Sequence, residues 1–241
     1  MIGASEANTE VLADPEALSR RVATWLLELA VSKEGVFTVC LSGGSTPQGL
    51  YKRLAEAPYL DAFPWSRTHW FWGDERFVPH DDVLSNYRMA RVALLSRAPV
   101  PPANIHPIPT ERLTADAAAS QYERELKSIY GAKRLDPAHP LFDVNFLGLG
   151  PDGHTASLFP GNAVLAERAK WVAAVIGAKP GARITLTYPT LESSRHAAFL
   201  VAGDEKRAIF RRLRYGDKSL PAARLHPIGT LWMFADAAAA G

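Results

Sequence analysis

The sequence predicts an α/β fold, in which a mostly parallel central sheet carries helices on both faces within a single domain. Short apolar runs rich in β-branched and aromatic residues alternate with amphipathic stretches along the chain. Strands that alternate with helices form βαβ units, which build parallel sheets. A length of 241 residues with 47% hydrophobic residues suits one large core. We expect residues 1–241 to form one domain and residues 1–9 and 236–241 to fray.

Composition narrows the class of protein. The chain carries 27 Lys+Arg against 25 Asp+Glu, a net charge of +2, so we expect no nucleic-acid partner. The one cysteine, Cys40, excludes an intramolecular disulfide and is expected to be inert packing in a strand. No run approaches the ~18 apolar residues that span a bilayer, and no basic region precedes an apolar run near the start. We therefore expect no membrane association and a cytoplasmic location.

The first predicted helix begins near residue 15. Asp14 can cap it, and Pro15 suits its first turn. Gly35 is expected to end it. An apolar stripe at helical spacing supports this helix: Leu18, Val22, Trp25, Leu26 and Leu29.

Alternating elements continue to the end of the chain. Residues 99–109 hold five prolines and are expected to form an irregular connection. Short apolar runs predict strands at 36–41, 69–72, 142–147, 171–176, 184–188, 197–202 and 231–234. Helical patterns follow at about 48–54, 86–95, 115–130 and 205–214.

Glycine-rich polar segments follow several predicted strands, where ligands bind in open α/β sheets. In the segment 42–47, Gly43 and Gly44 let the backbone turn sharply, while Ser45 and Thr46 add hydroxyls before a helix. Free amides at a helix start favour a phosphate or carboxylate. The alternative is an ordinary strand-to-helix turn capped by Ser or Thr. No P-loop pattern is present.

The pattern Gly148-x-Gly150-x-x-Gly153 matches a dinucleotide fingerprint only formally. Pro160 and Gly161 interrupt the long helix that the fingerprint requires, and the next strand ends without a carboxylate. We therefore reject dinucleotide binding.

The same segment holds Asp152 and His154, two residues apart. A carboxylate that orients an imidazole suits general-base catalysis, whereas the alternative is a capping Asp beside a surface His.

Further charged residues follow the strand at 69–72. Asp74, Glu75 and Arg76 offer acid/base groups and an anion clamp, or else form a solvated charged turn. Asn86 sits where a helix begins and is a candidate ligand contact. Lys206, at the start of the predicted helix 205–214, is placed to reach a phosphate.

Weaker candidates are expected to be solvated. His80, Asp81 and Asp82 are metal-ligand types without convergent spacing. Arg207, Arg211 and Arg214 follow a typical exposed helix face, and no serine-hydrolase elbow is present.

Taken together, these motifs resemble the 6-phosphogluconolactonase family over about residues 10–235. In the related deaminases the Gly-His pair runs into an Asn-Glu-Pro pattern, and Asp-Glu is followed by Tyr. Here the segments read Gly153-His154-Thr155-Ala156-Ser157 and Asp74-Glu75-Arg76-Phe77. The resemblance rests on the segments 41–47, 72–79, 85–87, 148–161 and 183–187.

The resemblance implies a Rossmann-like fold and hydrolysis of 6-phospho-D-glucono-1,5-lactone to 6-phosphogluconate without metal or organic cofactor. It also implies functional coupling to glucose-6-phosphate dehydrogenase. On this basis we hypothesise that His154 activates water, that Asp152 orients His154 and that Arg76 offsets the charge that develops on the intermediate. The substrate-binding residues are then Gly43, Gly44, Ser45, Thr46, Asp74, Glu75, Asn86, Arg183 and Lys206.

Two alternatives remain at the level of sequence. A glucosamine-6-phosphate isomerase or deaminase would release ammonia from its substrate. A non-catalytic sugar-phosphate sensor would bind 6-phosphogluconate without lactone turnover.

Overall fold

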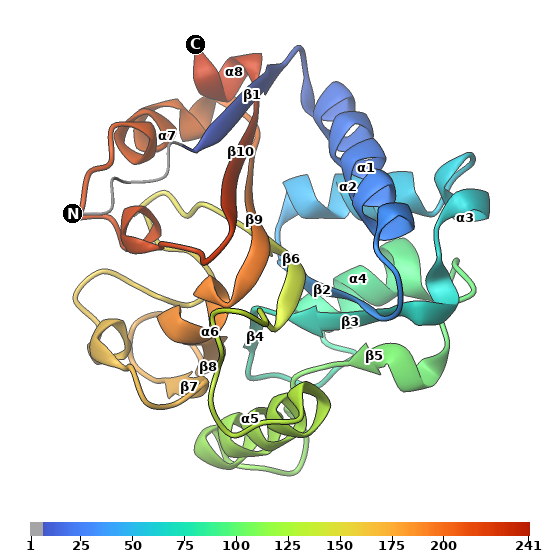
Figure 1. The fold of residues 1–241 in the computed structure, drawn as a ribbon. Coiled ribbons are helices and arrows are strands. Elements are labelled where there is room, and N and C mark those ends of the chain that lie inside the picture. The colour runs from blue at the N-terminus through green and yellow to red at the C-terminus, as the bar shows by residue number, and fades with distance from the viewer. Residues whose placement is uncertain (1–6) are drawn as a thin grey trace.

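A computed structural model describes residues 7–241, and its centre is a sheet of seven parallel strands (Figure 1). The strand order is β1-β10-β9-β6-β2-β3-β5, and every neighbouring pair is parallel. The predicted α/β class with a mostly parallel sheet is confirmed. The strands are β1 (Asn8–Leu12), β2 (Phe37–Leu41), β3 (Thr68–Trp72), β5 (Ile105–His106), β6 (Phe142–Leu147), β9 (Ser194–Val201) and β10 (Thr230–Asp236).

Helices cover both faces of this sheet. Connections that run from the β1 edge toward the β5 edge carry α1, α2 and α4 on one face, whereas those that return carry α5 and α7 on the other (Figure 1). Right-handed crossovers require this division. The helices are α1 (Pro15–Ser32), α2 (Ser45–Leu54), α3 (Tyr59–Ala62), α4 (Asn86–Ala90), α5 (Ala115–Tyr130), α6 (Tyr188–Glu192), α7 (Arg207–Arg214) and α8 (Ala237–Ala240).

A second, antiparallel sheet contains the strands predicted at 171–176 and 184–188 and one strand that was not predicted. It contains β4 (Asp74–Arg76), β8 (Arg183–Leu186) and β7 (Val172–Val175) in the order β4-β8-β7. The segment after β3 is therefore a strand and not a turn, because its backbone pairs with β8, far away in sequence. The strands predicted at 171–176 and 184–188 lie outside the parallel sheet, and Tyr188 begins α6.

Three more segments are more ordered than expected. The proline-rich connection 99–109 contains β5, which pairs with β3 at the sheet edge. At the chain ends, β1 pairs with β10, and Asp236 caps α8 through the amide of Ala239. Backbone pairing and capping thus hold residues that we expected to fray, while residues 1–6 lie outside the described part of the chain.

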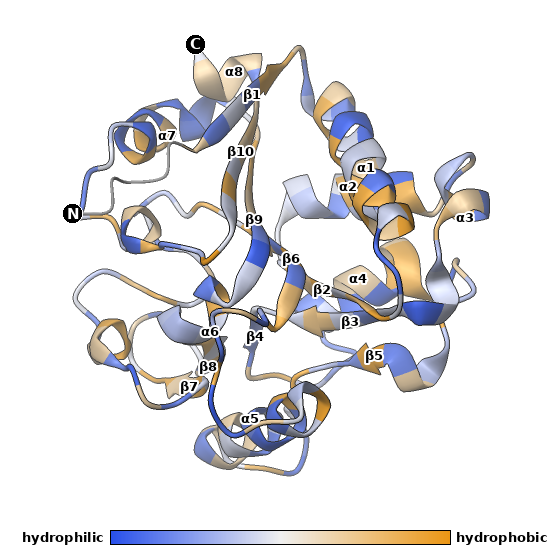
Figure 2. Cartoon of the chain, in the orientation of Figure 1, coloured by the Kyte–Doolittle hydropathy of each residue, from blue (hydrophilic) through white to orange (hydrophobic). Residues whose placement is uncertain are grey.

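The core is one continuous cluster of buried side chains between the sheet and its helices. Figure 2 shows both hydrophobic and hydrophilic positions along α1, α5 and α7, as amphipathic helices require. Cys40 is fully buried in β2, and this burial, followed by the charge of Asp74, raises the pKa of its thiol. The thiolate is therefore disfavoured, as expected for packing.

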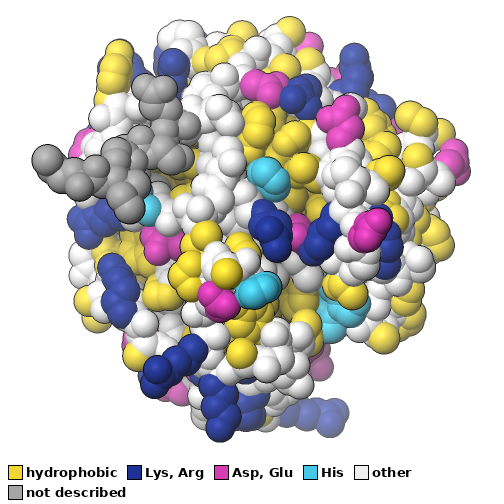
Figure 3. Space-filling model, viewed as in Figure 1, with side chains coloured by type: hydrophobic (Ala, Val, Ile, Leu, Met, Phe, Trp, Pro, Cys, Tyr) yellow, Lys and Arg dark blue, Asp and Glu magenta, His cyan; other side chains and the backbone are white. Residues whose placement is uncertain are grey.

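Side chains of both charge signs are interspersed on the face shown in Figure 3. Across residues 7–241, no helix combines the length and the hydrophobicity that crossing a membrane demands.

The cap of α1 supplies a test of the fold. Asp14 accepts a hydrogen bond of 2.8 Å from the amide of Ala17. We expect Asp14→Ala to lower the free energy of unfolding by about 1 kcal/mol, because it leaves that amide without its acceptor. Asp14→Asn keeps an acceptor and is the control. Urea unfolding measures both variants, and equal stability of Asp14→Ala and wild type would contradict the capping role.

Candidate active site

The sheet topology places a cleft beside the ends of β2 and β6. These strands are neighbours, yet the chain leaves β2 toward α2 on one face and leaves β6 toward the small sheet on the other. Such a switch point leaves a crevice at the carboxyl ends of the strands. A cleft of about 290 Å³ lies there. The residues predicted from sequence that line it are Gly43, Gly44, Asp74, Arg76, Asn86, His154 and Lys206.

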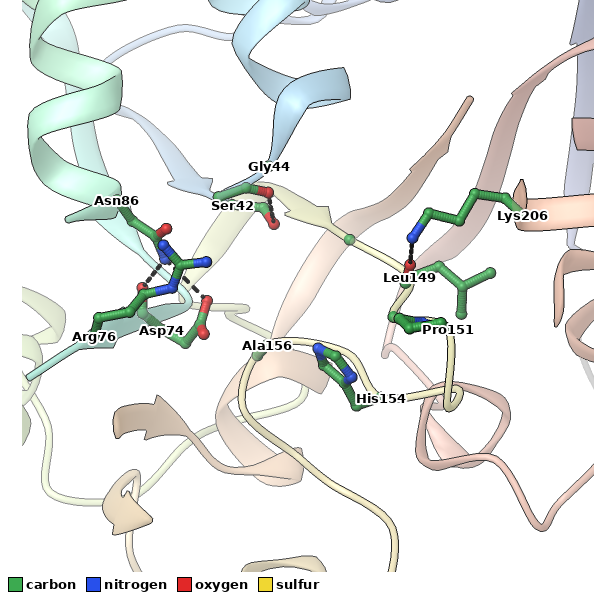
Figure 4. A pocket seen from close by; sticks show the side chains of 13 residues that line it. Ser42, Gly44, Asp74, Arg76, Asn86, Leu149, Pro151, His154, Ala156 and Lys206 are labelled. Atoms are coloured by element: carbon green, nitrogen blue, oxygen red, sulfur yellow. Dashed lines mark hydrogen bonds between the residues drawn. The ribbon is translucent and has the colours of Figure 1, made fainter. Parts of the chain in front are cut away.

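Figure 4 shows how these side chains face one another. Asp74, Arg76 and Asn86 group on one side, Lys206 lies on the opposite side, and the His154 ring lies between them (Figure 4). The segments that follow four adjacent strands, β9, β6, β2 and β3, thus meet at the carboxyl ends of those strands.

The glycine turn after β2 is not capped by a side chain. Gly44, at φ 109°, is the residue before α2 and makes no such bond. Within residues 7–241, no protein group accepts a hydrogen bond from the amides of Ser45 or Thr46. The alternative of a strand-to-helix turn capped by a Ser or Thr hydroxyl is therefore wrong. The Ser45 side chain is exposed and Thr46 is half-buried, and neither lines the cleft.

Gly43 has a steric reason to be glycine. A Cβ at this position would lie 2.1 Å from Oδ1 of Asn86. The side-chain nitrogen Nδ2 of Asn86 in turn donates to the backbone oxygen of Asp74 at 2.9 Å. Ser157 donates to the Asp74 carboxylate at 2.7 Å, so this carboxylate is held at the cleft wall.

Glu75 supports this wall from behind and does not line the cleft. Its buried carboxylate accepts from the amides of Arg76, Asn86 and Tyr87 at 2.7 Å each and from the Ser85 hydroxyl at 3.0 Å. Burial raises the pKa of Glu75, although these amide donors lower it in part. Three of these four bonds come from the start of α4 and one from Arg76 in β4, so Glu75 positions Asn86 and is not free to contact a ligand.

Asp152 and His154 form a hydrogen-bonded pair. Oδ1 of Asp152 contacts Nδ1 of the imidazole. Partial burial alone would raise the pKa of Asp152, but hydrogen bonds and charge from His154, with help from Lys179, lower it to about 2. An ionised Asp152 at Nδ1 leaves Nε2 of His154 as the proton acceptor.

The three glycines of the formal fingerprint have other roles. A Cβ at Gly150 would lie 2.0 Å from Nδ1 of His154. A Cβ at Gly148 would touch Ser42 at 3.4 Å. Gly153, at φ 80°, lies against Leu220. These glycines bring the loop close to the imidazole and to the neighbouring turn, and no long helix follows them.

Positive charge reaches the cleft from two directions. Lys206 donates to the backbone oxygen of Leu149 at 2.9 Å. Arg76 contacts the backbone oxygen of Leu84 and pairs in register with Arg183 across β4 and β8. Partial burial, and next the charge of Arg76, lower the pKa of Arg183. Arg183 does not line the cleft but lies beside Arg76 on the neighbouring strand.

The weaker candidates stay outside the cleft. His80 contacts the backbone oxygen of Ile108 at 2.9 Å, and Arg207 donates to that of Ala238 at 3.0 Å. In the part of the chain that the structure describes, no group of three His, Cys, Asp or Glu residues converges as metal ligands do.

Sequence reasoning did not single out three residues that shape the site. Leu149 supplies a carbonyl to Lys206, Ser157 holds Asp74, and Lys179 contacts Asp152. Ser157 lies in the motif 148–161, which was its only signal. Lys179 lies in a Gly- and Pro-rich connection without periodicity, so no pattern marked it.

An all-parallel sheet with a switch-point cleft, uncapped helix amides and a carboxylate-held imidazole defines an α/β fold whose cleft suits a small anion. The chain belongs to the family of glucosamine-6-phosphate isomerases/6-phosphogluconolactonase, whose model matches residues 13–233. The resemblance seen in the motifs is confirmed.

Individual relatives and a solved structure that are similar to this chain carry the name of the same family. The chloroplastic 6-phosphogluconolactonase 3 of Arabidopsis thaliana is 45% identical over 182 residues, which are 72% of this chain and 55% of that protein. The match thus spans about half the length of that relative. A 6-phosphogluconolactonase of Nostoc sp. is 38% identical over 237 residues and covers 95% of both chains. The crystal structure of 6-phosphogluconolactonase from Thermotoga maritima has a TM-score of 0.78 at 32% identity, covering 95% of this chain and 99% of that one.

Gly150 offers a direct test of the site geometry. We expect Gly150→Ala to displace the imidazole of His154, because the new Cβ would overlap the ring. The variant should lose the contact between Asp152 and His154, as seen in a crystal structure or in the imidazole resonances. Gly148→Ala in the same loop is the control, since its Cβ has ordinary contacts. An unmoved ring in Gly150→Ala would overturn the geometry.

Proposed function

We propose that this protein hydrolyses 6-phospho-D-glucono-1,5-lactone to 6-phospho-D-gluconate, in the oxidative branch of the pentose phosphate pathway. The observation that carries the proposal is that one cleft is lined both by His154, whose imidazole Asp152 holds from outside the lining, and by an uncapped helix start beside a lysine. The first suits attack on an ester carbonyl, and the second suits a phosphate.

The phosphate binds at the turn formed by Gly43 and Gly44. Ser45 and Thr46 contribute main-chain amides at the positive end of α2, since their side chains lie off the cleft. Lys206 adds an ammonium with donors beyond the one used by Leu149. Asp74 and Asn86, which lie across the cleft from Lys206, then face the sugar hydroxyls (Figure 4).

Hydrolysis follows from the position of His154. Nε2 takes a proton from water while the water oxygen attacks the lactone carbonyl carbon. Arg76 or loop amides stabilise the oxyanion of the tetrahedral intermediate, with Arg183 beside Arg76 adding to the positive field. When the intermediate collapses, the bond to the ring oxygen breaks, and the imidazolium returns its proton to that oxygen.

The rate acceleration that His154 must supply is modest. A positioned general base contributes about 10²–10⁴-fold, and a lactone already reacts slowly with water. Neither a covalent nucleophile nor a metal ion enters this mechanism. Asp74 is the one carboxylate among the described residues that line the cleft.

Functional coupling to glucose-6-phosphate dehydrogenase belongs to the same proposal, because that enzyme makes the lactone. A cytoplasmic location is likewise part of it, and cell fractionation would test it.

The first prediction concerns His154. We expect His154→Ala to lower kcat/KM by about 10²–10⁴-fold, because the general base is lost. Lactone made in situ by glucose-6-phosphate dehydrogenase gives the assay. His139→Ala, an exposed histidine away from the cleft, serves as control. Unchanged kcat/KM in His154→Ala would remove His154 from the mechanism.

The second prediction concerns Lys206. We expect Lys206→Ala to raise KM about tenfold or more, since a charge-assisted hydrogen bond to phosphate contributes about 1.5–3 kcal/mol. Arg211→Ala, on the exposed face of α7, is the control. Steady-state kinetics on the lactone measure both, and a KM that stays at the wild-type value would reject Lys206 as the anchor.

A further inference from the structure

Lys179 lies outside the cleft but contacts the carboxylate that holds His154. It lies in the connection between β7 and β8, where Gly177 and Gly181 have φ values of 81° and 75°. Its Nζ lies 3.2 Å from Oδ2 of Asp152, whereas Oδ1 of the same carboxylate contacts His154. The carboxylate of Asp152 therefore bridges an ammonium and an imidazole, one on each oxygen.

The ring of Phe159 joins the same two groups by a second route. Nζ of Lys179 lies 5.5 Å from the centroid of this ring, in cation–π range. The imidazole of His154 lies 4.7 Å from the ring, tilted by 51°. Phe159 is buried, so it is a fixed surface against which both groups rest. Lys179 is thus located by two independent contacts.

We propose that Lys179 is a positioning residue for the hydrolysis proposed above, on which this inference rests: its ammonium fixes the Asp152 carboxylate so that the carboxylate fixes His154. A carboxylate held at only one oxygen can rotate about its last bond and carry the imidazole with it. Contacts at both oxygens remove that freedom, and reacting groups must be held closely for catalysis.

The ammonium also affects the charge balance of the pair. The charged groups that act on Asp152 are His154 and Lys179. A positive charge beside the pair stabilises the anion of Asp152 and disfavours a second positive charge on the imidazole. Without Lys179, the pKa of Asp152 rises toward its usual range, because one of the groups that lower it is lost.

Lys179→Met tests the proposal, because methionine keeps an apolar stem over Phe159 and removes the charge. We expect kcat to fall by about tenfold with KM within about twofold, a smaller loss than the ~10²-fold cost of displacing a reacting group by 1 Å. The titration of the Asp152 carboxyl should move to higher pH, because one of the groups that lower its pKa is lost. Lys179→Arg should restore both values. Lys133→Met, at an exposed lysine after α5, is the control.

The carboxyl titration of Asp152, followed by NMR in wild type and Lys179→Met, separates this inference from the proposed function. A shift of that titration to higher pH in Lys179→Met supports the contact even if the wild-type chain does not hydrolyse the lactone. A kcat equal to that of wild type, or an Asp152 titration that does not move, would overturn the positioning role.

Discussion

The opposite directions in which the chain leaves β2 and β6 are the constraint on which the site depends. The two strands pair at Val39 with Val144 and at Cys40 with Asn145. Because α2 covers one face and the small sheet covers the other, neither connection crosses the gap between the strand ends. Backbone groups at that gap remain available to a ligand.

Close backbone approach then sets the chemistry of the cleft. Gly43 leaves room for Asn86, and Gly150 leaves room for the imidazole of His154. Glu75 holds the amides at the start of α4, so that Asn86 keeps its place beside Gly43. The proposed phosphate binding and base catalysis therefore rely on positions where any side chain would push a functional group away.

The sequence predicted the parts of the fold that local pattern determines. The strand at 142–147 and the helix at 115–130 match β6 and α5, because a buried apolar run and an amphipathic repeat are strong local signals. Strand β4 was missed, since charged residues are rare in strands and its pairing with β8 joins distant segments. Strands β1 and β5 were missed for a related reason: they lie at the two sheet edges and pair with β10 and β3, which are distant in sequence.

In the candidate site, too, local patterns were predicted and contacts between distant segments were missed. Glycines next to polar residues after strands marked Gly43, Gly44, Asp74 and His154, all of which line the cleft. Glu75 looked equally suitable in sequence, but side chains alternate along β4 and direct its carboxylate into the interior. Contacts between loops, such as that of Lys179 with Asp152, have no signal in a single sequence.

The central claim is that one cleft binds the phosphate at the turn after β2 and presents the other end of the substrate to His154. A crystal structure with 6-phosphogluconate bound tests it most directly. The account predicts the phosphate at the amides that follow Gly43, with Lys206 in contact, and the product carboxylate within hydrogen-bond distance of Nε2 of His154. A product bound in the reverse direction, or bound away from this cleft, would contradict it.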